Sequence, residues 1–241
     1  AKLKPLVLSV WGSDVYAFPY QSRLKRYLII RNLLYANQIA STSYNMAEQV
    51  KGLIKTYNIK INITPFGVDI NKFSPQNKVE NKKNICIGNI KKLESQYGID
   101  DLIKSIRILI DNLINKDLKN IAEKIQVNIY GDGEQKEELI NLINRLGLQN
   151  IIYLKGRIPN NEVPKALEEM DVFCVTSVSE SFGVAVVEAM SMELPVVATD
   201  ASGFREVVEH NVTGIIVERK NPVVRIRFIQ RVLLMSCLIC V

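Results

Sequence analysis

The chain has 241 residues, of which 47% are hydrophobic, so it can bury a sizeable core, and its composition excludes an intrinsically disordered protein. The formal charge of +6 and the pI of about 9.0 fit anionic partners such as phosphates, anionic lipid or nucleic acid, and equally an ordinary solubility charge. Four scattered cysteines exclude a disulfide framework, and the CxxC pair Cys237 and Cys240 has no second pair or histidine nearby. We therefore expect reduced thiols and no metal site.

The first part of the chain alternates short predicted strands and helices. The expected elements are a strand at 6–12, a basic helix at 22–36, a strand at 38–43, a helix at 47–57 and a strand at 61–69. Three strands and two helices make only half of a typical doubly wound sheet. The chain also opens with Ala1 and shows no signal-peptide cleavage pattern. We therefore expect residues 1–75 to form an incomplete domain of a fragment that lacks its natural start.

A polar run, SPQNKVENKKN, occupies residues 74–84. Its Pro, Asn and Lys content is typical of an interdomain linker. This composition predicts a domain boundary between residues 75 and 76.

Residues 76–221 repeat the alternation in longer form. The predicted strands lie at 84–88, 126–131, 151–156, 171–177, 195–200 and 213–218. Between them, apolar residues recur at helical spacing, as at Ile99, Leu102, Ile103 and Ile106. Strands that alternate with helices favour parallel pairing with both faces of the sheet covered. The pattern predicts an α/β, doubly wound, Rossmann-like domain.

The tail at 222–241 departs from this pattern. It ends in an apolar run of about ten residues, whereas a membrane-spanning helix needs about 20. An interfacial helix would need a clean apolar face, which the mixture of charged and apolar residues does not form. We interpret the segment as an aberrant tail and expect the authentic sequence to end or change frame near Asn221.

Two carboxylates, Glu180 and Glu188, lie in SESFGVAVVEAMSMELPVVAT, a segment that otherwise has the composition of a core. In an open parallel sheet the loop that follows a strand and enters a helix is where ligands bind. The first N–H groups of a helix and its dipole stabilise a phosphate, and carboxylates are good acceptors for sugar hydroxyls. The alternative is that Glu180 caps the helix and Glu188 is a solvated helix residue. Two glutamates eight residues apart favour neither interpretation by themselves.

The surrounding pattern, ESFGVAVVEAM followed by PVVATDASGFRE, resembles the donor-binding motif of retaining glycosyltransferases of the GT-B fold, family 4 (glycosyl transferases group 1). The resemblance extends over nearly the whole chain up to about Pro222. It implies two Rossmann-like doubly wound domains, the N-terminal one incomplete. Residues 1–75 would be the C-terminal half of the acceptor-side domain, and residues 76–221 the domain that binds a nucleotide-sugar donor.

The resemblance also implies roles for the residues of this motif. Glu180 would be the catalytic-site residue that contacts hydroxyls of the transferred sugar, and Glu188 would hold the ribose of the nucleotide. Phe182, Gly183 and Val184 match the turn whose backbone amides approach the diphosphate.

Three further segments match the family. In CIGNIKKLESQYGIDD, Lys92 falls where the family has a diphosphate-binding arginine, whereas Tyr97 replaces the usual lysine. One of the two customary cations is therefore either missing or supplied by a neighbour such as Lys91. LKGRIP resembles the loop whose backbone meets the nucleobase, at about Ile158. YGDGEQKEEL resembles a strand, a GDG turn and a helix, although the GDG turn alone is equally a tight turn.

The acceptor side is matched by WGSDVY, with Gly12 and Asp14 facing the cleft. For Asp14, a turn or capping role is an open alternative. His210, the sole histidine, lies in a surface turn by its pattern and is interpreted as structural. The family's usual N-domain histidine would lie upstream of Ala1, so no general base is assigned. The resemblance instead implies that the leaving diphosphate helps to deprotonate the acceptor, while the protein supplies positioning and electrostatic stabilisation.

The resemblance thus implies a retaining hexosyltransferase-type enzyme that moves a sugar from a nucleotide diphosphate donor to a glycan or lipid-linked acceptor in cell-surface polysaccharide synthesis. It implies no metal and no cofactor besides the nucleotide-sugar co-substrate. The alternative is a truncated, inactive derivative that binds nucleotide without turnover. An epimerase or a phosphorylase fits the motif or the chain length less well. Nucleic acid is disfavoured as a partner because the lysines are not interleaved with aromatic residues.

The expected localisation is cytoplasmic, with peripheral contact at the inner face of the membrane. The basic helix at 22–36 has Arg23, Lys25, Arg26 and Arg31 beside apolar residues, which suits docking on anionic lipid. A core helix with a charged outer edge is the alternative.

Overall fold

The computed structural model describes residues 5–55, 59–76, 82–219 and 221. It divides into two compact units, Ala1–Gly67 with Glu180–Gly183, and Val68–Ser179 with Val184–Val241. The predicted tail at 222–241, with its CxxC pair, lies outside the described residues.

The first unit contains a three-stranded parallel sheet in the order β1-β2-β3. Its elements are β1 (Val7–Val10), α1 (Ser13–Tyr16), α2 (Phe18–Gln21), α3 (Arg23–Tyr35), β2 (Gln38–Ser41), α4 (Tyr44–Ile54) and β3 (Ile61–Ile63). Serine side chains fix the starts of the two long helices, because Ser22 accepts from Lys25 N and Ser43 accepts from Met46 N. The predicted strands and long helices are present, whereas the four-residue helices α1 and α2 were not predicted.

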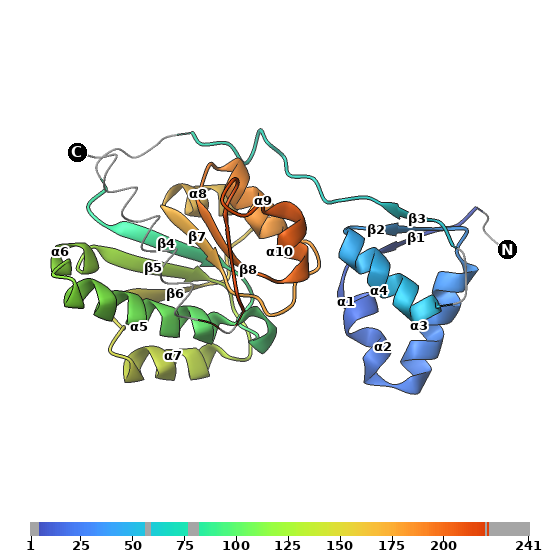
Figure 1. Ribbon diagram of the computed structural model, residues 1–241, viewed down its shortest axis with the longest axis horizontal. Helices are drawn as coiled ribbons and strands as arrows, with labels where there is room; N and C mark the ends of the chain where they lie inside the picture. The colour runs from blue at the N-terminus through green and yellow to red at the C-terminus, as the bar shows by residue number, and fades with distance from the viewer. Residues whose placement is uncertain (1–4, 56–58, 77–81, 220, 222–241) are drawn as a thin grey trace. The chain divides into compact units, whose positions relative to one another are not determined.

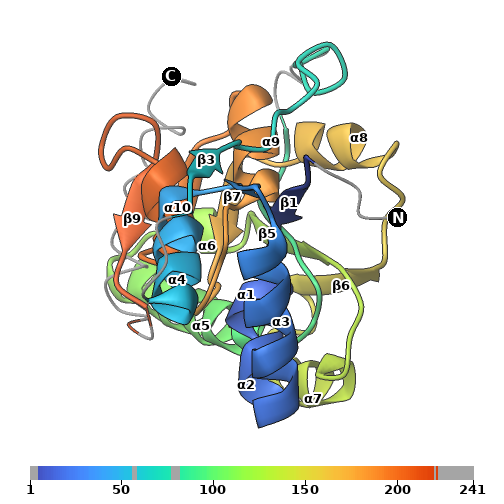
Figure 2. The same ribbon diagram turned by 90° about the vertical axis from the view of Figure 1, so that its right-hand side faces the viewer.

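The core of the first unit lies on one face of this sheet. Val10 and Ile39 from the strands pack with Leu33 of α3 and Met46 of α4, all of them almost fully buried. Val7, which points to the other face of β1, is 58% exposed. Figure 2 shows α3 and α4 running beside each other in this unit.

The second unit contains a six-stranded sheet that is parallel throughout. Its strands are β4 (Ile85–Ile90), β5 (Ile125–Tyr130), β6 (Ile152–Gly156), β7 (Val172–Val175), β8 (Val196–Thr199) and β9 (Ile215–Val217). They are ordered β6-β5-β4-β7-β8-β9. The predicted doubly wound sheet is therefore confirmed. The order of the strands reverses between β4 and β7, which makes this pair the topological switch point.

Helices cover both faces of the second sheet, as Figure 1 shows. One face is covered by α5 (Ile99–Asn115), α6 (Lys119–Ala122) and α7 (Lys136–Arg145), and the other by α8 (Val163–Glu168), α9 (Val184–Ser191) and α10 (Ser202–Val207). Strand residues alternate between the two cores. Ile87 and Val172 belong to the core of α5 and α7, whereas Cys86 and Phe173 belong to that of α8, α9 and α10. Buried Cys86 and Cys174 are free thiols.

The polar run predicted as an interdomain linker does not separate the two units. Gln76 N donates to Glu168 Oε1 at 3.1 Å, and Lys82 Nζ donates to the carbonyls of Glu168 and Met170 at 3.2 and 3.3 Å. Residues on both sides of 77–81 are thus bound to the C-terminal end of α8, where an ammonium group satisfies the last carbonyls. Lys82 also pairs with Asp171 at 3.1 Å. The described residues of this run, 74–76 and 82–84, therefore belong to the second unit.

The observed division at Gly67 precedes the boundary predicted after residue 75. The reason is that the intervening residues pack on the second unit. Phe73 is 6% exposed in the core of α8, α9 and α10, and its carbonyl accepts from Ser191 Oγ at 2.5 Å. Composition alone could not show that this one aromatic residue anchors the segment.

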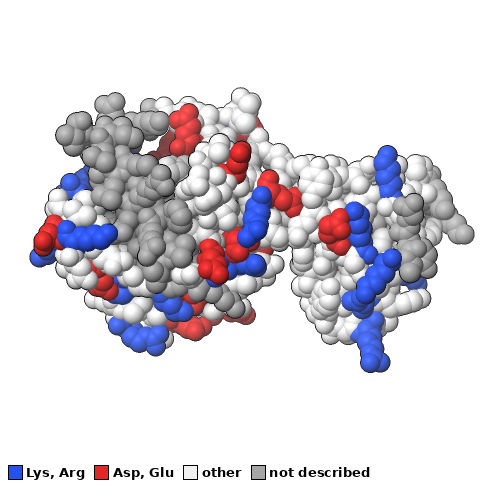
Figure 3. Space-filling model, in the orientation of Figure 1, with Lys and Arg blue, Asp and Glu red and all other residues white. Residues whose placement is uncertain are grey.

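Charged residues are distributed differently over the two units. In the view of Figure 3, acidic and basic side chains alternate over the second unit, whereas Lys and Arg predominate on the first. Throughout the described ranges, no helix combines the length and the apolar character needed to cross a bilayer.

Candidate functional site

Two loops meet at the topological switch point, at the carboxyl ends of β4 and β7. The loop after β4 runs from Lys91 to Gly98 and includes the 3₁₀ turn η1 (Ser95–Tyr97). The loop after β7 bonds to it twice, because Val178 N donates to Gln96 O at 2.8 Å and Thr176 Oγ1 donates to Tyr97 O at 3.0 Å. Open parallel sheets bind ligands at this place. The two loops therefore form the framework of the candidate site.

Gly98 allows the two loops to approach this closely. Its φ is 59°, a left-handed conformation that favours glycine. A Cβ atom there would lie 2.5 Å from the carbonyl oxygen of Thr176, which is backbone and cannot swing away. The residue also precedes the first turn of α5. Only glycine fits this position without displacing one of the loops.

The GDG turn supports the loop after β4 from its other side. Lys91 N donates to Tyr130 O at 2.9 Å, Leu93 N donates to Asp132 O at 3.1 Å, and Gln135 N donates to Leu93 O at 3.0 Å. The strand, GDG turn and helix predicted for this stretch are present as β5, the turn and α7. The turn thus holds the residues that immediately follow β4.

The switch point has a polar lining within the core of the sheet. Asn89 Nδ2 on β4 donates to Cys174 O on β7 at 2.7 Å, beyond the last paired residues of these strands. The Asn89 Oδ1 and Ser177 Oγ atoms are buried and have no hydrogen-bond partner among the protein groups of the described part. Buried polar atoms in native proteins normally have partners, so the site suits a water or a ligand hydroxyl.

Glu188 lies at the middle of α9 and is half-buried. Burial raises the pKa of its carboxyl group, while the ammonium groups of Lys72 and Lys91 oppose this shift without cancelling it. A partly desolvated carboxylate in the field of two cations can accept hydrogen bonds from hydroxyl groups of a ligand whose phosphates bind the cations. This combination is the chemical centre of the site.

The loop after β4 presents its two lysines differently. The Lys92 side chain is 72% exposed, and its Nζ lies 3.5 Å from Glu94 Oε1. The Lys91 ammonium lies 4.9 Å from the centroid of the Tyr97 ring and acts on Glu188. The structure thus brings Lys91 to the candidate site. The diphosphate role of Lys92 stays a prediction.

Ile158 lies in the loop between β6 and α8, where it packs partly buried on the core of α8, α9 and α10. Two residues later, the Asn160 carbonyl accepts from Lys72 Nζ at 2.8 Å. The same ammonium group that acts on Glu188 therefore also holds the loop predicted to meet a nucleobase. That role of Ile158 stays a prediction.

The loops after β8 and β9 form the rim beside the loop after β7. Arg219 Nη1 donates to Val178 O at 2.8 Å, and Arg219 Nε donates to Asp200 Oδ1 at 2.8 Å. Burial alone would raise the pKa of Asp200, but the hydrogen bonds from Arg219 and the charges of Arg219 and Arg205 lower it below the usual range. Asp200 thus links the loops after β8 and β9, and Arg219 extends this link to the loop after β7.

The remaining predicted residues divide between the two units. Val184 begins α9 in the second unit, whereas the segment Glu180–Gly183 is grouped with the first. Gly183 has a φ of 96°, which a side chain would strain. The placement of Glu180 beside a transferred sugar and the role of Phe182 stay predictions.

The acceptor-side prediction concerns Gly12 and Asp14 in the first unit. The Asp14 carboxylate accepts from Gly12 N at 2.6 Å and from Trp11 N at 3.1 Å, at the start of α1. The structure thus shows the turn role that the sequence left open for Asp14. An additional contact to an acceptor stays a prediction for both residues.

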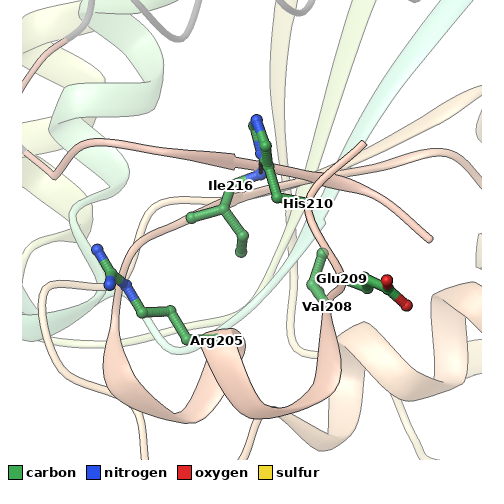
Figure 4. Close-up of a pocket in the computed structure, with 5 residues that line it drawn as sticks. All are labelled: Arg205, Val208, Glu209, His210 and Ile216. Carbon is green, nitrogen blue, oxygen red and sulfur yellow. Dashed lines mark hydrogen bonds between the residues drawn. The ribbon is translucent and has the colours of Figure 1, made fainter. Parts of the chain in front are cut away.

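A hollow beside α10 and β9 is lined by Arg205, Val208, Glu209, His210 and Ile216 (Figure 4). His210 Nδ1 accepts from Ile216 N at 3.0 Å, so the imidazole closes the turn between α10 and β9. Among all residues that the structure describes, no three His, Cys, Asp or Glu side chains gather as metal ligands.

Comparison with known families decides the classification. The family model of the glycosyl transferases group 1 matches residues 70–236, and a second model, glycosyl transferase 4-like, matches residues 1–43. The chain belongs to the glycosyl transferases group 1 family. The first match includes every element of the switch-point site.

Related members of this glycosyltransferase family occur in bacteria and archaea. An amylovoran biosynthesis glycosyltransferase of Erwinia amylovora is 30% identical over 161 residues, which cover 64% of this chain and 37% of that protein. An uncharacterized glycosyltransferase of Methanocaldococcus jannaschii is 27% identical over 197 residues, covering 77% of this chain and 48% of its own length. The chain spans about half or less of the length of these relatives.

Solved structures confirm the GT-B fold class of this chain. TarM of S. aureus, crystallised with UDP, matches with a TM-score of 0.75 and 22% identity over 97% of this chain and 45% of that one. Anabaena HepE with UDP and glucose matches with a TM-score of 0.74 and 20% identity over 97% of this chain and 62% of that one. A sucrose-phosphate synthase from Thermosynechococcus elongatus reaches a TM-score of 0.79 at 16% identity.

Sequence reasoning missed one residue of the candidate site and gave another a secondary role. Lys72 is not among the residues predicted from the sequence, and Lys91 is predicted only as a substitute for Tyr97. The one signal for Lys91 is its position directly after β4, at the carboxyl edge of the sheet. No local pattern marks Lys72, because its partners on α9 and in the loop after β6 are about 90 or more residues away.

Proposed function

We propose that the protein is a retaining glycosyltransferase that transfers a sugar from a nucleoside diphosphate donor to a glycan or lipid-linked acceptor in cell-surface polysaccharide synthesis. The single observation that supports this most is Glu188, a partly buried carboxylate on α9, directly after β7, whose pKa the charges of Lys72 and Lys91 lower against the effect of burial. Such a site offers cations for a diphosphate and an acceptor for ribose hydroxyls.

The names of the relatives support the acceptor class. They include proteins of amylovoran, colanic acid and teichuronic acid biosynthesis. Several structures with the same fold contain UDP, with a sugar or an acceptor in some of them. These ligands belong to those proteins. They make a nucleoside diphosphate sugar the first donor to test here.

In the proposed reaction, the bond between the anomeric carbon and the diphosphate breaks, and a new glycosidic bond forms to an acceptor hydroxyl. The leaving diphosphate takes the proton of that hydroxyl. Lys91 stabilises the negative charge that develops on the diphosphate, and Glu188 holds the ribose so that the reacting atoms stay aligned. No metal or organic cofactor is part of the proposal.

The competing function is nucleotide binding without sugar transfer. Both functions require the same donor site, so binding is tested first and transfer second. Release of free nucleoside diphosphate in the presence of a matching acceptor distinguishes a transferase from a binding protein.

The donor site is tested by titration calorimetry of Glu188→Gln and Glu180→Gln with nucleoside diphosphates and with the corresponding nucleotide sugars. Loss of a charge-assisted hydrogen bond, about 1.5–3 kcal/mol, should weaken nucleoside diphosphate binding by Glu188→Gln roughly tenfold or more. Glu180→Gln should bind the free nucleotide normally and the nucleotide sugar more weakly. Unchanged affinities in both variants would refute the donor-site assignment.

A further inference from the structure

The turn formed by residues 69–73 is bound to the face of α9 that includes Glu188. Ser191 Oγ donates to Phe73 O at 2.5 Å. Residues three apart on a helix lie on the same face, so Glu188 and Ser191 face the same turn. Lys72 is the neighbour of Phe73 in this turn. The backbone of Lys72 is therefore held beside the face of α9 that includes Glu188.

The turn itself is rigid, which fixes the base of the Lys72 side chain. Asp69 Oδ1 accepts from Asn71 N at 3.0 Å, and Asp69 O accepts from Phe73 N at 2.8 Å. Phe73 is buried in the core beneath. Lys72 Nζ donates to the carbonyl of Asn160 at 2.8 Å, and Asn160 lies in the loop between β6 and α8. The turn thus bonds to α9 through the Phe73 carbonyl and to that loop through the Lys72 ammonium.

We infer that Lys72 is a positioning residue of the nucleotide site, one that holds the loop after β6 through Asn160 and supplies a permanent positive charge facing Glu188. The inference rests on the proposed function in that it assigns Lys72 to the same site. It goes beyond it because neither the motif nor the predicted ligand contacts include Lys72.

Lys91 and Lys72 have different roles in this arrangement. Lys91 lies on the loop after β4, where a diphosphate would engage it. Lys72 is held by a neutral carbonyl and stays available to Glu188 when the diphosphate binds. A diphosphate adds negative charge, which favours protonation of a nearby carboxyl group. Lys72 opposes that protonation and so keeps Glu188 as an acceptor for ribose hydroxyls.

Other charged groups on the elements packed against α9 are engaged elsewhere. Asp200, after β8, pairs with Arg219 at 2.8 Å and with Arg205 of α10 at 3.3 Å. Glu206 of α10 is exposed. Of the described residues, the charged groups that act on Glu188 are Lys72 and Lys91, with Lys72 the larger of the two.

The first test uses the ligand-free protein and is independent of any nucleotide. The carboxyl carbon of Glu188 is followed by ¹³C NMR across pH, with its signal assigned by its absence in Glu188→Gln. Lys72→Met should raise the pKa of Glu188, and Lys72→Arg should restore it. Hydrogen exchange in residues 157–162 should also become faster in Lys72→Met. An unmoved Glu188 titration together with unchanged exchange would overturn the inference.

The matched control is Lys119→Met. Lys119 is an exposed lysine of the same unit, on α6, paired at 3.8 Å with Glu123. This variant removes the same charge and the same hydrogen-bonding group without touching the site. It should leave both readouts at their wild-type values, and an equal effect in Lys119→Met would show that net charge, and not position, is responsible.

The second test measures binding of UDP, GDP and ADP in turn across pH. In Lys72→Met, affinity at neutral pH should fall roughly two- to fivefold, as for a partly exposed charge interaction, and the acidic limb of binding should move to higher pH. If the wild type binds a nucleotide and the pH dependence of binding is the same in Lys72→Met, the inference is contradicted and the proposed function is not. If the wild type binds none of the three nucleotides, the proposed function is contradicted. The ligand-free test then still decides the role of Lys72.

Discussion

Glu188 shows how one residue can favour function at the expense of stability. Its carboxyl group is partly buried, and burial raises its pKa despite the nearby ammonium groups of Lys72 and Lys91. A raised carboxyl pKa means that the folded protein binds a proton more tightly than the unfolded chain does. Ionisation of Glu188 therefore opposes folding in the absence of ligand.

This reasoning predicts that Glu188→Gln stabilises the ligand-free protein at neutral pH while it weakens nucleotide binding. Below the unfolded pKa of glutamate, about 4.3, the carboxyl group is protonated in both states and the variant has no advantage. As pH rises through the folded pKa, the wild type loses stability and the variant does not. Thermal unfolding from pH 4 to 7.5 measures the difference.

The control is Glu123→Gln, whose carboxyl group is exposed beside Lys119 on α6. It should unfold like the wild type over the same pH range. A Glu188→Gln variant that is less stable than the wild type at pH 7 would show that the carboxylate is a favourable structural contact and not a strained ligand-binding group.

At the scale of elements, the loop after β4 depends on Gly98. Gly98→Ala places a Cβ atom against the Thr176 carbonyl and in a left-handed conformation, which alone costs about 1–2 kcal/mol. Gly147 is the matched control, because its φ is 66° and a Cβ atom there meets nothing within 4 Å. Gly98→Ala should therefore be less stable than Gly147→Ala in chemical denaturation.

The same pair of variants separates the site from the rest of the fold. Gly98→Ala should also weaken nucleotide binding, because the loops after β4 and β7 move apart. Gly147→Ala, at the end of α7, should bind like the wild type. Equal losses of stability in the two variants would show that the loops can yield to the added methyl group.

The helix α3 packs one side on the core of the first unit and exposes the other. Leu33 is buried in the core of the first unit, and Ile29 and Ile30 pack partly against it. On the opposite side Leu24 and Tyr27 are 66% and 60% exposed. Docking of this exposed, basic face on anionic lipid stays a prediction.

Vesicle flotation tests the docking of α3. The protein should float with anionic vesicles at low salt and detach as salt is raised, because screening weakens the attraction of Arg23 and Arg31 to the surface. The double variant Arg23→Glu and Arg31→Glu should bind less. Absence of binding to anionic vesicles at low salt would exclude this role of the helix.

The sequence predicted the second unit's elements well, for physical reasons that are local. Helices such as α5 have an apolar residue at every third or fourth position, and the strands are short β-branched runs bounded by turns. It gave no residue range for α8 or α10, which have only six residues each and begin without a side-chain cap. Short uncapped helices leave little periodic signal and depend on tertiary packing.

At the scale of the molecule, what the sequence could not predict is non-local. The order of the strands, and hence the switch point, depends on pairings between β4 and β7, which lie more than 80 residues apart. The contacts of Lys82 are also non-local. The polar sequence around it predicts a linker, whereas its ammonium group binds the carbonyls at the C-terminal end of α8. Composition records which residues are polar, whereas their partners are decided by the folded chain.

The central claim is that a nucleoside diphosphate binds at the carboxyl ends of β4 and β7. It is tested most directly by mapping ¹⁵N amide shifts while UDP, GDP or ADP is added to the wild-type protein. The account predicts that the largest changes lie in residues 91–98, 176–179 and 184–188. Changes centred on the hollow of His210 and Ile216, or at the amino ends of the strands near Lys82 and Asp171, would contradict it.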